Sequence, residues 1–370
     1  MSVINSTCPY CGVGCGVCID QSHSKTIVLG DKDHPANFGR LCSKGSALAD
    51  TLESKTSEVD HSYKRLTHPK IDGADVTWDH ATTEIANKIN ASIDEFGRDS
   101  VAFYLSGQLL TEDYYVANKF MKGFIGSANV DTNSRLCMSS AVAAYKRAFG
   151  ADSVPCSYED IDAADLIVLI GSNAAWTHPV LYQRMVAAKQ ARPNMKVVLI
   201  DPRATASADL VDLHLPLKPS SDGFLFNGLL HFLNANNALD REFIAQSTNG
   251  FDALIESVET ATLAATAQHT NLVESDVREF FELFANTQKT LSFYSMGINQ
   301  SATGTDKCNA IINCHLATGK IGKEGAGPFS ITGQPNAMGG REVGGLSNQL
   351  AAHMDFDSED IDRVQRFWKS

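Results

Sequence analysis

The segment DLIVLIGSN, Asp165 to Asn173, indicates the fold class of this 370-residue chain. Its apolar run is shorter than an ordinary helix, and the Gly-Ser-Asn turn after it is typical of a buried strand that ends in a loop. The pattern returns at KVVLI, Lys196 to Ile200, which Asp201 and Pro202 end. Residues 178–190, between the two runs, have helical spacing. Short β-branched strands alternating with helices predict a parallel, doubly wound α/β sheet.

The same alternation extends outward from this segment in both directions. Towards the N-terminus, the spacing predicts a helix over 78–96 and a buried strand ending in a loop over 101–107. Towards the C-terminus, it predicts helices over 222–234 and 274–284 and a strand over 290–294. From Gly319 onward the character changes: residues 319–345 are dense in glycine and have no periodicity, so we expect a loop rather than a core element there, and nothing before Ser370 resembles a closing element.

Charge and hydropathy exclude several classes of function. With 31 basic and 43 acidic side chains the net charge is −12, which argues against a nucleic-acid-binding surface. The longest apolar runs are too short to cross a bilayer, so we expect no membrane segment. The first residues lack the basic stretch and apolar run of an export signal, which predicts a cytoplasmic location. In a reducing cytoplasm, clustered cysteines are metal ligands or redox groups rather than disulfides.

Four cysteines near the N-terminus have the spacing of a metal centre. The segment CPYCGVGC supplies Cys8, Cys11 and Cys15, and GRLCSKG adds Cys42 after 26 further residues. Four thiolates are the usual ligands of a [4Fe-4S] cluster. A zinc site is the alternative, but zinc sites usually pair two C-x2-C units and only one is present. Cys18 is a fifth candidate that a four-ligand site does not need, and we expect a small buried hydrophobe there.

Several separated motifs, in order along the chain, resemble those of the molybdopterin oxidoreductases, and among these the assimilatory and periplasmic nitrate reductases. They are CPYCGVGC, GRLCSKG, NSRLCMSS at 133–140, IGSN at 170–173, MGINQ at 296–300 and TGQPNAMGGREVGG at 332–345. The resemblance implies a [4Fe-4S] cluster and a molybdenum bis(molybdopterin guanine dinucleotide) centre. It also implies reduction of nitrate to nitrite by oxygen-atom transfer to molybdenum, with electrons delivered through the cluster.

The resemblance assigns metal ligands residue by residue. The cluster ligands would be Cys8, Cys11, Cys15 and Cys42. Lys44 matches a family lysine between cluster and pterin that assists electron passage, although sequence alone would make it an ordinary solvated lysine. Cys137 matches the thiolate that the family supplies to molybdenum, a soft ligand for a metal that also takes dithiolene sulfurs. By spacing alone Cys137 would be a buried thiol near a helix start. Three other cysteines have no ligand spacing and are expected to be buried and inert: Cys156, Cys308 and Cys314.

The expected contacts with the pterin guanine dinucleotide lie mostly at strand ends. Ligands of open α/β sheets bind at the carboxyl ends of strands. Backbone amides of a small-residue turn can approach a pyrophosphate closely, and a carboxylate after the next strand can bind a ribose or the guanine edge. Asp222 matches a family aspartate associated with guanine and is also a candidate helix N-cap. Without the resemblance to this family, Met296 would be interpreted as a core residue. The full set is Gln108, Asn133, Gly171, Ser172, Asn173, Asp201, Asp222, Met296 and Gln300.

Residues near Cys137 favour nitrate over formate. Formate dehydrogenases of the family tend to place His after the metal-bound Cys or selenocysteine and Arg in an RGQNN motif, whereas this chain has Met138 and Thr332 there. Methionine cannot accept the proton that formate oxidation releases. Arg341 is a candidate guide for the nitrate anion and equally a candidate ligand for a cofactor phosphate. The catalytic set that the resemblance implies is Cys137, Met138, Arg341 and Lys44.

Two alternative functions stay open. One is a formate dehydrogenase of the same family. The other is a non-catalytic iron-sulfur electron-transfer subunit, which the NSRLC context of Cys137 argues against. For the nitrate reductase, the electron donor would be ferredoxin, flavodoxin or an NADH-linked reductase subunit, with nitrate as the small-molecule substrate and no nucleic-acid or membrane partner.

The resemblance also implies a domain organisation. We expect a [4Fe-4S] domain at 1–55, a split α/β domain at 56–132 and 332–370, and an inserted α/β domain at 133–331 that binds molybdopterin guanine dinucleotide. Family members continue into the rest of the split domain and a C-terminal domain, so this chain is expected to be a truncated enzyme with little turnover alone.

Overall fold

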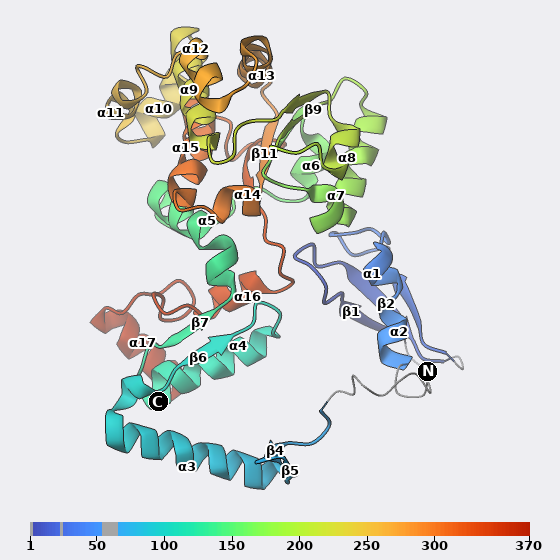
Figure 1. Cartoon of the computed structure of the whole chain (residues 1–370), viewed down its shortest axis with the longest axis vertical. Helices are drawn as coiled ribbons and strands as arrows, with labels where there is room; N and C mark the ends of the chain where they lie inside the picture. The colour runs from blue at the N-terminus through green and yellow to red at the C-terminus, as the bar shows by residue number, and fades with distance from the viewer. Residues whose placement is uncertain (1–2, 23–24, 54–65) are drawn as a thin grey trace.

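The N-terminal unit is a small antiparallel sheet beside two short helices. The computed structural model describes residues 3–22, 25–53 and 66–370 (Figure 1). Strands β1 (Ile4–Thr7), β2 (Gly16–Asp20) and β3 (Ile27–Gly30) pair in that order, and helices α1 (Ser43–Ser46) and α2 (Leu48–Glu53) follow. A bond from Cys8 N to Cys15 O (2.8 Å) closes the cysteine loop between β1 and β2. The expected boundary at 55 and 56 lies outside the described residues.

The next unit is built on a pair of parallel strands, β6 (Phe103–Leu105) and β7 (Val130–Thr132). Its other elements are β4 (Lys70–Ile71), β5 (Ala74–Asp75), α3 (Trp78–Phe96), η2 (Arg98–Ser100), α4 (Thr111–Asn118) and the π-helix η3 (Lys119–Ile125). The helix expected at 78–96 is confirmed. The buried strand expected over 101–107 is wrong in length and burial, because β6 has three residues and Tyr104 is 70% exposed. In the described chain β6 pairs with β7 alone, so part of it stays open to solvent.

The main sheet has five parallel strands in the order β10-β9-β8-β11-β12. DLIVLI forms the central strand β8 (Leu166–Ile170), whose five residues are fully buried, as the sequence predicted. The other strands are β9 (Lys196–Ile200), β10 (Leu213–Leu215), β11 (Thr290–Tyr294) and β12 (Gly327–Ser330). A chain that runs from β8 outward in one direction, and later from β11 outward in the other, is doubly wound. All five strands lie within the expected inserted domain, whose division from the split domain stays a prediction.

Helices cover both faces of this sheet (Figure 1). One apolar core packs Val168 and Ile170 against α5 (Ser134–Phe149), α9 (Asp222–Ala235), α13 (Glu274–Asn286) and α15 (Gly304–Ala317). The other packs Ile167 and Leu169 against α6 (Glu159–Ala163) and α8 (Pro179–Ala191), and it also contains Cys8, Val13 and Cys15. The N-terminal unit therefore shares a core with the main sheet. The remaining helices of this part are α7 (Ala174–Thr177), η4 (Ala206–Leu210), α10 (Arg241–Ser247), α11 (Phe251–Ser257), α12 (Leu263–Thr270) and α14 (Met296–Asn299).

The glycine-rich tail corrects the expectation of loops after Gly319. Residues 327–330 form β12, a buried strand, and α16 (Ala337–Glu342) and α17 (Ser358–Trp368) follow. Pro328 is compatible with a strand here because β12 is the last strand of the described sheet and has a partner on one side only. Trp368 and Val364 of α17 pack against Leu350 and Ala351, so the tail also forms a small core of its own.

No helix among the described residues has the length and apolar character needed to span a membrane.

Candidate functional site

The candidate cofactor residues converge at the carboxyl edge of the main sheet. Winding reverses between β8 and β11, so a crevice between their following turns is where an open α/β sheet binds its ligand. Gly171, Ser172 and Asn173 follow β8, and Met296 and Gln300 follow β11. Asp201 follows β9 at the same edge. The topology therefore brings together residues that the sequence spreads over 130 positions.

Two glycines let the β8 and β11 turns meet. Gly171 has φ +53°, and a Cβ on Gly297 would lie 2.5 Å from the Gly171 Cα. The Gly297 amide donates to the Gly171 carbonyl (2.9 Å). A side chain at either position would push the two turns apart, which explains the glycines in IGSN and MGINQ.

The polar groups at this edge fit a polar cofactor. Ser172 is 1% exposed, and its Oγ has no hydrogen-bond partner among the described residues. A buried hydroxyl without a partner costs free energy unless a ligand supplies one. The Asp201 Oδ1 accepts from the Arg203 amide (2.9 Å), and Asn173 Oδ1 accepts from Ser207 Oγ (3.1 Å). Nearby, a hollow of about 640 Å³ opens beside Pro202, Lys218 and His269.

Asp222 has a buried partner that the sequence did not reveal. Its Oδ2 accepts from Lys307 Nζ (2.9 Å), and both side chains are less than 10% exposed. The N-cap interpretation of Asp222 is wrong, because Ser221 is the N-cap of α9 and Asp222 is the first helical residue. The role of Asp222 towards guanine stays a prediction.

Asn133 joins the β6 turn to the start of α5. It is the N-cap residue of α5, and its Oδ1 accepts from the Gly107 amide (2.6 Å). Gln108, the next residue along, is exposed. Met296 begins α14 and is half-buried rather than a core residue, and its Sδ accepts from Ser295 Oγ (2.8 Å). Gln300 ends the same turn and is exposed.

Cys137 lies in the first turn of α5 and is half-buried. Its Sγ is 4.0 Å from Thr332 Oγ1, in the turn after β12. The Thr332 carbonyl in turn lies 2.7 Å from Nε2 of the buried His178. Burial lowers the pKa of His178, so this imidazole is neutral. A neutral Nε2 beside a carbonyl carries the proton, and it donates to Thr332.

Met138 and Arg341 have partners other than a substrate. Met138 is 2% exposed in the core, and its Sδ accepts from Asn299 Nδ2 (2.9 Å). Arg341 forms a buried ion pair with Asp152, through Nε (2.8 Å) and through Nη2. The sequence made Arg341 a candidate anion guide or phosphate ligand, and the ion pair with Asp152 is a third role that the sequence did not indicate. The catalytic assignments of both residues stay predictions.

The four expected cluster ligands share one neighbourhood. Burial raises the pKa of Cys8, Cys11 and Cys15, the last to about 12, and nearby Cys42 adds to each increase. The Lys44 cation opposes the increase at Cys8 and Cys11, although Lys44 itself is exposed. Grouped thiolates therefore need a positive centre to balance them, and an iron-sulfur cluster supplies one. Within residues 3–22, 25–53 and 66–370, no group of three or more His, Cys, Asp or Glu is arranged to hold a single metal ion.

The cysteine loop contacts the turn that leads to Cys137. The Gly12 amide donates to the Gly333 carbonyl (3.1 Å), and a Cβ on Gly12 would lie 2.3 Å from the Thr332 carbonyl oxygen. Tyr158 Oη donates to the carbonyls of Gly12 and Val13, both at 3.1 Å. Segment 332–336 thus touches the cysteine loop on one side and, through Thr332, the Cys137 thiol on the other.

All nine cysteines are free thiols. Cys308 and Cys314 are buried, as expected, and burial raises the pKa of both. Cys18 and Cys156 are half-buried rather than fully buried, because they lie in a surface strand and in a loop. Burial also raises the pKa of Cys156.

Sequence reasoning missed Tyr158, His178 and Asp152. Each makes its contact with a residue more than 130 positions away in the sequence. None lies in a motif with ligand or catalytic spacing, so the sequence offered no signal for them.

Comparisons with known proteins identify the family of the chain. Two family models match the chain: Molybdopterin oxidoreductase over residues 65–363 and Molybdopterin oxidoreductase Fe4S4 domain over residues 1–54, which include all four expected cluster ligands. A nitrate reductase of Klebsiella oxytoca is 54% identical, with 100% of this chain and 41% of that protein covered. A nitrate reductase of Shewanella frigidimarina is 51% identical, with 100% of this chain and 40% of that protein covered. The chain therefore spans about two fifths of the length of these curated relatives.

A solved structure shares the fold. Acetylene hydratase from Pelobacter acetylenicus matches with a TM-score of 0.74 at 21% identity, over 87% of this chain and 44% of that one. The mixed α/β fold with an N-terminal iron-sulfur domain is thereby confirmed.

Proposed function

Because the chain belongs to the molybdopterin oxidoreductase family, we propose that it forms the cluster-binding part and one pterin-binding half of a nitrate reductase. The whole protein would convert nitrate, two electrons and two protons into nitrite and water. The observation that supports this best is the 332–336 segment, which joins the cysteine loop to Cys137. Electrons entering at the cluster would have a short route to the reaction centre.

The residues of the chain have distinct tasks in this proposal. When bound, the molybdenum cofactor supplies oxygen-atom transfer and the cluster supplies one-electron steps. Cys137 would be a ligand of the metal, and Thr332 Oγ1 is placed to donate a weak hydrogen bond to its thiolate. Ser172 Oγ would donate to the cofactor, and Asp201 and Asp222 would bind its nucleotide end. Cys8, Cys11, Cys15 and Cys42 would hold the cluster, with Lys44 beside them.

Nitrate is the substrate that the site favours. Position 138 offers a buried thioether rather than a proton acceptor, and position 332 offers a threonine. Neither can accept the proton that formate oxidation releases. The two relatives at more than 50% identity are named nitrate reductases. The proposal extends to the guanine dinucleotide form of the pterin, a role in nitrate assimilation, a cytoplasmic location and a ferredoxin, flavodoxin or NADH-linked donor.

The test uses the natural gene product that contains these 370 residues, because the relatives are longer. Purified with its cofactors, it should reduce nitrate with reduced viologen dye and leave formate unchanged. Cys137→Ala should abolish turnover while iron content stays at the wild-type value, whereas Cys156→Ala, a cysteine without an assigned role, should keep both. Formate oxidation without nitrate reduction would replace the proposal with the dehydrogenase alternative. Iron without molybdenum or pterin would replace it with the electron-transfer alternative.

A further inference from the structure

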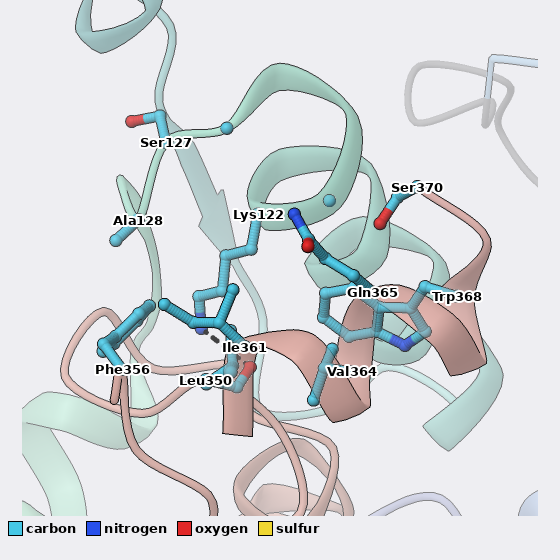
Figure 2. Close-up of a pocket in the computed structure, with 12 residues that line it drawn as sticks. Lys122, Ser127, Ala128, Leu350, Phe356, Ile361, Val364, Gln365, Trp368 and Ser370 are labelled. Carbon is cyan, nitrogen blue, oxygen red and sulfur yellow. Dashed lines mark hydrogen bonds between the residues drawn. The ribbon is translucent and has the colours of Figure 1, made fainter. Parts of the chain in front are cut away.

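Lys122 lies on a π-helix, a rare helix type, and is not one of the candidate site residues. The π-helix η3 continues directly from α4, and Lys122 lies in its middle. π-Helical turns are uncommon and often occur at functional positions. Figure 2 shows Lys122 reaching from this helix towards Leu350, beside a cavity of about 250 Å³ that Phe356 and Trp368 help to line.

The Lys122 ammonium is surrounded by backbone carbonyls of one segment. Its Nζ donates to the carbonyls of Gly344 (2.6 Å) and Leu346 (2.9 Å), and also to that of Gln349. The carbonyl of Leu350 lies at 3.5 Å. An ammonium group has three protons, so the four oxygens share them.

A second donor on the same face contacts further carbonyls of this segment. Asn118 Nδ2, one turn earlier, donates to the carbonyls of Val343 (2.7 Å) and Leu350 (2.9 Å). Five carbonyls of the 343–350 segment thus point at one helix. Converging carbonyl dipoles repel one another unless a positive charge lies between them.

Within the part of the chain that the structure describes, Lys122 forms no ion pair with a carboxylate, and an aromatic ring, that of Phe356, lies 5.8 Å from Nζ. Burial lowers the pKa of Lys122 to about 7, and the more distant Asp131 opposes this. The neutral carbonyl oxygens are therefore the groups that stabilise the ammonium.

We propose that Lys122 is a built-in monovalent cation that fixes the 343–350 segment, and that its carbonyl site binds K⁺ or NH₄⁺ when the side chain is removed. Neutral carbonyl rings replace the hydration shell of monovalent cations, whereas Ca²⁺ and Mg²⁺ sites rely on carboxylates. Because this ammonium is covalently attached to the chain, the order of the 343–350 segment does not depend on the salt in solution.

The segment is connected to the candidate site, so its order matters there. Gln349 Nε2 donates to the Arg341 carbonyl (2.9 Å). Arg135, two residues before Cys137, donates through Nη2 to Ser347 Oγ (3.3 Å) and Asn348 Oδ1 (3.0 Å). Lys122 is therefore a positioning residue, and it acts on the start of α5 through this segment.

The experiment compares thermal unfolding in different chloride salts at equal ionic strength and at about pH 6, where Lys122 is protonated because this pH lies below its pKa of about 7. Lys122→Ala in the 370-residue chain should have a Tm several degrees higher in KCl or NH₄Cl than in tetramethylammonium chloride, whose cation is too large for the site. Wild type should have one Tm in all three salts. Lys119→Ala, on the same helix but over the Phe124 ring instead of carbonyls, is the matched control and should also be insensitive. A folded Lys122→Ala with the same Tm in every salt would overturn the proposal.

A second pair of variants keeps the test decisive if Lys122→Ala does not fold. Lys122→Arg keeps a cation and should retain slow amide exchange over 343–350, whereas Lys122→Met should speed it by at least about tenfold. If amide exchange over 343–350 were as slow in Lys122→Met as in wild type, the segment would not need a cation, which would contradict the proposal.

Discussion

At the scale of single residues, one hydroxyl binds the cysteine loop to the α/β core. Tyr158 Oη donates to the carbonyls of Gly12 and Val13, which lie between the expected ligands Cys11 and Cys15. Tyr158→Phe should loosen this loop, admit water and raise the cluster's midpoint potential, because hydration favours the more negative reduced form. The lost hydrogen bonds should also cost about 1 kcal/mol of stability. Electron paramagnetic resonance during redox titration measures the potential.

Tyr182→Phe is the control for this prediction. Tyr182 Oη also donates to a backbone carbonyl, that of Ala206 (3.4 Å), far along the chain from the cysteine loop. The Tyr182→Phe variant should therefore leave the midpoint potential of the cluster unchanged. Equal midpoint potentials in Tyr158→Phe and wild type would show that the Tyr158 hydroxyl does not influence the cluster.

At the scale of elements, a buried histidine connects a helix to the centre of the sheet. His315 of α15 lies 2.8 Å from Ser292 Oγ in β11 and 3.0 Å from the Lys320 carbonyl, and burial lowers its pKa to about 3. The unfolded chain binds a proton on this histidine below about pH 6.5, whereas the folded chain does not, so stability falls as the pH falls from about 6.5 towards 3. The expected loss is about 1.4 kcal/mol per pH unit in this window.

Denaturant unfolding at pH 7.5 and 5.5 tests this histidine. His315→Gln should show a smaller loss between the two pH values than wild type, by about 1 kcal/mol. If His315→Gln keeps the wild-type pH dependence, protonation of other groups accounts for the acid sensitivity.

Most elements with regular periodicity were predictable from the sequence, although the amphipathic helix α17 was missed, and elements determined by tertiary contacts were not predictable. β8, β9, β11, α3 and α13 have apolar runs or spacing that reveal them. β12 was missed because GPFS has little intrinsic strand preference, and pairing with β11 makes it a strand. The position of the candidate residues at one edge of the sheet was predictable because parallel topology dictates where strand ends meet. Thr332 was noted in the sequence, but its contact with Cys137 depends on β12 and therefore could not be foreseen.

At the scale of the whole molecule, the N-terminal unit and the main sheet domain share an apolar core and several hydrogen bonds. Cys8 and Cys15 belong to the same apolar cluster as Ile167 and Leu169 of β8, and the Gly12 amide donates to the Gly333 carbonyl. Ordering the cysteine loop around a cluster should therefore also order the 332–336 segment. Removing iron should speed amide exchange in both 8–15 and 332–336. Helix α13 packs on the opposite face of the sheet, so its exchange should stay unchanged. Unchanged exchange at 332–336 after iron removal would show that the two units fold independently, and the route from cluster to Cys137 would then need another connection.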